Sequence, residues 1–115
     1  MSNIRNLTLG KPTTLRKIEF EYEGEKVYFH QPTRKIMKQL QQKSMVGGEF
    51  DFATYQALSV IYLTFDKDGN SIFNEADLES FMELPATGGW FETFAEKVAS
   101  AFMDEVADPK PSKED

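Results

Sequence analysis

One apolar segment, residues 52–65, constrains what this chain can fold into more than any other feature. Its apolar side chains recur at three- and four-residue steps, and further apolar residues widen the stripe: Phe52, Tyr55, Leu58, Ile61, Tyr62 and Phe65, then Ala57, Val60 and Leu63. Asp51, directly before it, is a residue type that caps helix N-termini. A helix that is apolar on most sides must be buried. The 115-residue chain is therefore expected to form one domain around a helix at 52–65.

Residues 15–30 alternate between apolar and charged side chains, a pattern typical of a strand pair with one buried face. The side chains that share the apolar face are Ile18, Phe20, Tyr22, Val27 and Phe29. Between them, residues 23–25 contain a glycine and form a turn signal. The segment predicts an antiparallel β-hairpin.

Three further helices are indicated at about 33–44, 75–84 and 90–104 by helical spacing and by flanking Pro, Asn and Gly residues. Residues 14–106 are thus expected to form a single globular domain. Residues 1–13 are predicted to be a flexible arm and residues 107–115 a disordered tail, because neither has an apolar period to bury. The fold class predicted is α+β, mostly helical, with an N-terminal β-hairpin packed on three to four helices.

Composition removes most enzyme classes. There is no Cys, and His30 is the only His, so thiolate chemistry and most histidine-based metal and acid-base sites are excluded. Neither a phosphate-binding glycine loop nor a nucleophile elbow occurs. We predict no catalytic residue, no cofactor and no enzyme activity. No apolar run approaches the roughly 20 residues that span a bilayer, and the start lacks a signal peptide, so we predict no membrane partner and a cytoplasmic location.

Charge is divided unevenly along the chain. Residues 1–47 hold nine basic and four acidic residues, residues 48–109 hold two basic and thirteen acidic, and the whole chain has a net charge of −6. The simplest interpretation of this uneven charge is that the charged residues form solvated faces. The alternative is self-association, in which a basic patch on one copy meets an acidic patch on the next. Basic residues gather on the 33–44 helix, but the acidic remainder repels phosphate, and we predict no nucleic-acid partner.

The segment from Asp66 to Asp77 has the outline of a calcium-binding EF-hand loop. Oxygen donors stand at positions 1, 3 and 5, as Asp66, Asp68 and Asn70. Position 6, which requires Gly, is Ser71, and position 12, which requires a Glu, is Asp77. Because both departures fall where the geometry is strictest, we interpret the loop as a turn between helices and predict no metal site. Metal binding by Asp66, Asp68, Asn70 and Asp77 remains an alternative.

Residues 14–103 resemble the tail assembly chaperones of long-tailed bacteriophages and prophages. The resemblance is carried by an apolar helix that runs into a D-x-D-G turn, a short helix start, an acidic helix and a last amphipathic helix. The matching text is LSVIYLTFDKDGNSIFNEADLESFMEL, followed by GGWFETFAEKVASAF.

The resemblance implies a chaperone that binds the tape measure protein, keeps it soluble, and promotes assembly of the tail tube around it. It also implies tail tube subunits as further partners, self-association, a place in the host cell cytoplasm, and absence from the mature virion. Aromatic and Met side chains around the Gly88-Gly89 link are the candidate partner-binding residues: Phe81, Met82, Trp90, Phe91 and Phe94. Aromatic residues at helical spacing equally suit a core.

Two other functions remain as alternatives. The first is a module with a single EF-hand-like calcium site at residues 66–77. The second is a small structural or adaptor component that stays in the phage tail.

Overall fold

The chain is organised around α3, Phe52–Leu63. In the computed structural model, which describes residues 3–12 and 14–102, six of its twelve residues are buried, as expected for a helix apolar on several sides. Its N-terminus is fixed by Asp51, whose carboxylate accepts a hydrogen bond from the backbone N–H of Thr54 at 2.9 Å. The sequence prediction of a capped, buried central helix is confirmed.

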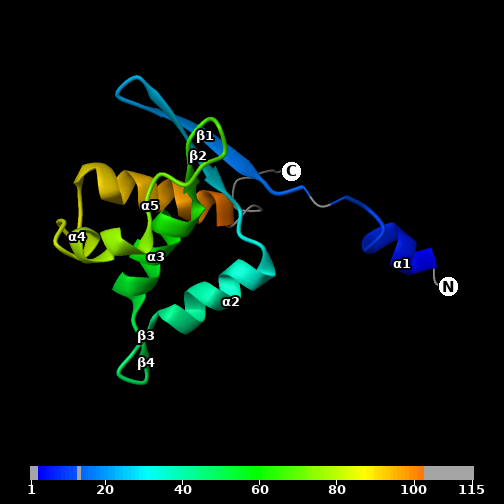
Figure 1. The fold of residues 1–115 in the computed structure, drawn as a ribbon, viewed down its shortest axis with the longest axis horizontal. Coiled ribbons are helices and arrows are strands. Elements are labelled where there is room, and N and C mark those ends of the chain that lie inside the picture. The colour runs from blue at the N-terminus through cyan, green and yellow to red at the C-terminus, as the bar shows by residue number, and fades with distance from the viewer. Residues whose placement is uncertain (1–2, 13, 103–115) are drawn as a thin grey trace, which may run out of the picture.

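A three-stranded antiparallel sheet covers one side of the helices (Figure 1). β1, Lys17–Tyr22, and β2, Glu25–His30, form the predicted hairpin, with Ile18 opposite Phe29 and Phe20 opposite Val27. The third strand, β5, Thr64–Phe65, pairs with β2. This corrects the predicted helix 52–65, which ends at Leu63, because the extended backbone of Thr64 turns the chain into the sheet.

Between the hairpin and α3 lie a helix and a second, very short hairpin. The helix α2, Arg34–Lys43, is capped by Thr33 and falls inside the predicted range 33–44. β3, Met45–Val46, pairs with β4, Glu49–Phe50, across Gly47 and Gly48. Both glycines have positive φ angles, of 61° and 84°, which a two-residue hairpin turn requires and which only glycine adopts without strain.

The predicted helix at 75–84 is divided. Residues Glu75–Asp77 form a single 3-10 turn, η1, and α4 spans only Leu78–Met82. Asn74 and Asp77 form a reciprocal capping box at its start, as their spacing predicts. The last described helix, α5, spans Gly89–Phe102, and the predicted end at residue 104 lies outside the described residues.

The N-terminal segment, for which the sequence predicts a flexible arm, contains one short element. Residues Asn3–Thr8 form a short helix, α1, none of whose residues is buried. Figure 1 shows α1 standing apart from the rest of the fold. The predicted tail, 107–115, lies outside the described residues.

The core lies between the sheet, α3 and α5. Its fully buried members include Phe29, Leu40 and Val60, and aromatic side chains from both sheet and helices pack around them. The α+β class predicted from the sequence, with an N-terminal hairpin packed on helices, is confirmed.

Candidate functional site

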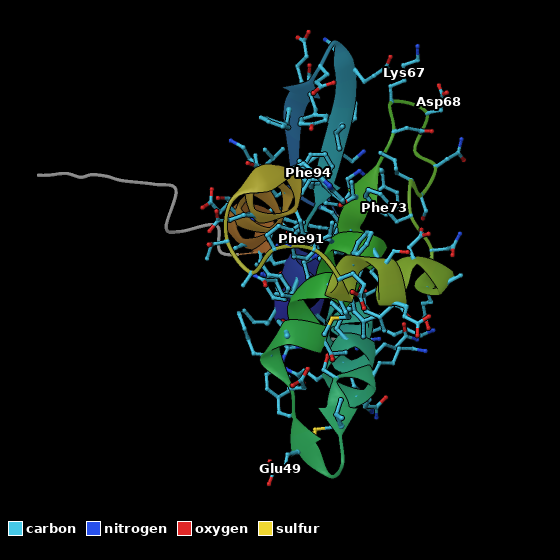
Figure 2. All side chains as sticks on the ribbon, turned by 90° about the vertical axis from the view of Figure 1, so that its left-hand side faces the viewer. Glu49, Lys67, Asp68, Phe73, Phe91 and Phe94 are labelled. Carbon is cyan, nitrogen blue, oxygen red and sulfur yellow. The ribbon has the colours of Figure 1, made fainter. Side chains whose placement is uncertain are left out.

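The aromatic residues proposed from the sequence as a partner-binding face mostly lie in the core. Phe81 and Phe94 are buried, Trp90 and Phe91 are half-buried, and only Met82 is well exposed. The ring centroids of Trp90 and Phe94 are 5.1 Å apart, and those of Phe81 and Phe91 are 5.4 Å apart. Figure 2 shows Phe91 and Phe94 on the same helix, close to the middle of the molecule. The structure thus gives these rings partners within the chain.

The loop with the outline of a calcium site uses its carboxylates for turn and cap hydrogen bonds. The Asp66 Oδ1 atom accepts from the backbone N–H groups of Asp68 and Asn70, both at 2.9 Å. Asp77 Oδ2 accepts from the backbone N–H of Asn74 at 2.9 Å, which serves the helix start. No group of three or more His, Cys, Asp or Glu side chains suited to a metal ion occurs among residues 3–12 and 14–102.

An exposed apolar surface lies instead at the tip formed by the short β3–β4 hairpin and the start of α3. Its four members are large and well exposed: Met45, Val46, Phe50 and Phe52, at 49%, 55%, 51% and 63% of full exposure. We call this set the hairpin tip. Figure 2 shows it at the end of the molecule marked by Glu49. Exposed clusters of this kind mark interaction sites in soluble proteins.

A shallow apolar groove adjoins the hairpin tip. It runs between α3 and α5, has a volume of about 280 Å³, and is lined mainly by apolar side chains: Phe52, Tyr55, Gln56, Ser59, Ala95, Val98, Ala99 and Phe102. We call it the α3–α5 groove. The small residues Ala95 and Ala99 of α5 and the rings of Phe52, Tyr55 and Phe102 are among its lining residues. Its shape and chemistry suit an apolar side of a helix.

Sequence reasoning missed both surfaces, although one signal was available. Two glycines between the pairs Met45-Val46 and Glu49-Phe50 match a two-residue hairpin turn, which would have projected these apolar residues away from the core. The groove had no such signal, because Ala95, Val98 and Ala99 read as core residues in the sequence. It arises only where the fold brings α3 and α5 side by side.

One basic residue of the first half of the chain pairs with an acidic residue of the second half. Lys43 Nζ on α2 lies 3.3 Å from Glu75 Oε2, and the Tyr62 hydroxyl donates to the same carboxylate. The hydrogen bonds from Tyr62 and Lys43 hold the pKa of Glu75 below its ordinary value, and the Glu75 partner raises that of Lys43. The remaining basic residues of α2 are exposed: Arg34, Lys35 and Lys38.

His30 at the end of β2 has a structural environment. Its ring stacks on Phe65 with centroids 4.1 Å apart. Burial lowers its pKa below the ordinary value, and the charge of Lys17 lowers it further. The His30 ring is thus packed against a strand of the sheet, and its partial burial disfavours the charged form.

No helix within the described parts of the chain is long and apolar enough to cross a bilayer.

Comparison with known proteins places the fold. No known family and no curated protein matches the sequence. Among solved structures, the chain is similar to the bacteriophage HK97 tail assembly chaperone, with a TM-score of 0.57 and 16% identity over 85% of this chain and 95% of that one. The two proteins therefore share a fold, as the resemblance in the sequence implies, and it extends over almost the whole of the HK97 chain.

Proposed function

We propose that this protein is a phage tail assembly chaperone that binds the tape measure protein and keeps it soluble while the tail tube forms. The observation that carries the proposal is the hairpin tip, an exposed apolar surface on a fold shared with the HK97 tail assembly chaperone. An assembly chaperone needs such a surface, because its client exposes apolar side chains until assembly covers them.

The hairpin tip suits transient binding of a long helical client. Three of its side chains belong to the paired β3–β4 hairpin and Phe52 begins α3, so little order is lost when they become covered. Met45 and Phe50 are directly paired across the hairpin and present two unlike, adaptable apolar shapes. Amphipathic helices of varied sequence can pack on such a surface.

The proposal includes a place and time of action. The chaperone acts in the host cell cytoplasm, hands the tape measure protein to tail tube subunits, and is absent from the mature virion. It has no catalytic step, and its effect on the client comes from binding alone.

Co-expression tests the proposal. The tape measure protein of the phage or prophage that encodes this chain is produced with and without it, and the soluble fraction of the tape measure protein is measured. We expect a several-fold larger soluble fraction with the chain present. Equal aggregation in both cases would refute the proposal.

A pair of variants localises the effect. The double substitution Met45→Ser/Phe50→Ser removes two large apolar side chains of the hairpin tip, and Ile72→Ser, at a residue 41% exposed outside the tip, is the matched control. We expect the tip variant to lose most of the solubilising effect and the control to retain it. If both variants act like the unchanged protein, the hairpin tip is not the client surface.

A further inference from the structure

The N-terminal helix α1 carries an apolar stripe that no other residue among those the structure describes covers. Ile4 and Leu7 lie three residues apart on one side of the helix, and Leu9 follows it; they are 66%, 50% and 74% exposed. Side chains three residues apart on a helix are neighbours, so Ile4 and Leu7 form one continuous edge. Figure 1 shows this helix away from the body of the molecule.

The α3–α5 groove offers the complementary shape. Ala95 and Ala99 leave room for a helix to approach closely, and Phe52 and Phe102 provide apolar walls. Ala99 lines the groove and is exposed. Within residues 3–12 and 14–102, the chain thus carries an exposed apolar helix edge and an apolar groove of suitable shape.

Charges near the two surfaces are also complementary. α1 and its connection carry Arg5 and Lys11 and no acidic residue between positions 3 and 12. On α5, Glu92 and Glu96 lie beside the groove-lining residues, whereas the Lys97 ammonium lies over the Phe20 ring, 5.0 Å from its centroid, on the sheet side of the helix. The groove edge on α5 is therefore acidic, and its charge is opposite to that of α1.

We propose that α1 of one copy of this chain docks in the α3–α5 groove of a second copy, and that the exchange is reciprocal. In the structure α1 stands apart from the body of the molecule, whereas Arg16 lies near the end of α5, where its Nη1 donates to the carbonyl of Ala101. The connection of eight residues, 9–16, spans at most about 29 Å, enough to reach a neighbouring molecule. Exchange of an identical element around a two-fold axis gives both copies the same new contacts and closes the assembly.

The inference concerns the association of the chain with itself and does not rest on the proposed function, although Phe52 belongs both to the hairpin tip and to the lining of the groove. It also differs from association through the separated charges. Docking of Ile4 and Leu7 in an apolar groove persists at 0.5 M salt, whereas head-to-tail pairing of exposed charges is largely screened there.

Sedimentation of the purified full-length chain tests the proposal at low salt and at 0.5 M salt. We expect a dimer under both conditions. Ile4→Asp/Leu7→Asp places charges on the docking edge and should weaken dimerisation about 100-fold or more, since each buried side chain of this size contributes at least about a factor of ten. The control Asn6→Asp adds a negative charge to the side of α1 away from Ile4 and Leu7 and should remain dimeric at 0.5 M salt.

The groove is tested in the same way. Ala99→Glu places a charged side chain in its lining and should give a monomer, while Ser100→Glu, one position along the same helix and exposed, should not. Circular dichroism confirms that each variant is folded.

Mixing the two disrupted variants distinguishes docking of α1 in a second copy from docking of α1 in the groove of its own chain. The Ile4→Asp/Leu7→Asp protein retains its groove and the Ala99→Glu protein retains its helix α1, so their mixture should form a heterodimer with one intact contact. A monomer for the unchanged protein, dimers that survive both sets of disruptive substitutions, or a mixture that stays monomeric would each overturn the proposal.

Discussion

Replacing Phe94 by Ala distinguishes a core position from a client-binding one. Phe94 is 5% exposed, and its ring centroid lies between 5.1 and 6.5 Å from those of five other rings: Phe20, Tyr22, Phe29, Phe73 and Trp90. Removing a buried phenyl ring costs about 3–5 kcal/mol, because transfer energy is lost and a cavity remains. Since small domains are stable by only about 5–15 kcal/mol, Phe94→Ala should remove a large share of the total.

Urea unfolding measures the effect, with the fluorescence of Trp90, the single tryptophan, and far-ultraviolet circular dichroism as independent readouts. A loss of about 4 kcal/mol lowers the midpoint by about 2 M at the slope typical of a small domain. The control is Met82→Ala, another of the aromatic and Met residues near the Gly88-Gly89 link; its side chain is 47% exposed and should change stability by less than about 1 kcal/mol. Equal midpoints for the two variants would refute the placement of Phe94 in the core.

Three other predictions follow from particular contacts. Stability should fall as pH drops below about 6.5, because the unfolded chain binds a proton at His30 more readily than the folded chain, and His30→Gln should reduce this loss in urea titrations at pH 5 and pH 7. Thr64→Val should raise the free energy of unfolding by about 1 kcal/mol in the same assay, because the Thr64 hydroxyl is buried with no hydrogen-bond partner and valine has nearly the same shape. Calorimetric titration with calcium should give no binding heat at millimolar concentration, because Asp66 and Asp77 are used for turn and cap hydrogen bonds; a saturable heat lost in Asp68→Ala would contradict this.

Much of the fold follows from local patterns. The alternation at residues 17–30 fixes which side chains of the hairpin face the core, and the caps Asp51 and Asn74 mark true helix starts. These predictions are correct because the hydrophobic period and the capping pattern depend on only a few consecutive residues. The strand β5 does not follow from such a pattern, since Thr64 and Phe65 become a strand only through pairing with β2.

The candidate site was harder to predict than the fold. The residues around the Gly88-Gly89 link are conspicuous in the sequence, but ring-to-ring packing across α4 and α5 draws most of them into the core. Whether an apolar residue is core or surface depends on what the tertiary fold places against it, which spacing alone does not specify. The glycine pair signals a turn in the sequence. Only the fold shows that this turn, at Gly47 and Gly48, leaves Met45, Val46 and Phe50 exposed.

The most direct test of the central claim is recovery of the chain with its proposed client. The affinity-tagged tape measure protein is purified from cells that co-express either the unchanged chain or the Met45→Ser/Phe50→Ser variant, and the amount of chain that elutes with it is quantified. We expect the unchanged chain to co-purify with the tape measure protein and the amount of the variant to be at least about tenfold lower, because two large apolar side chains are removed from the contact. Absence of the unchanged chain from the purified tape measure protein would contradict the account.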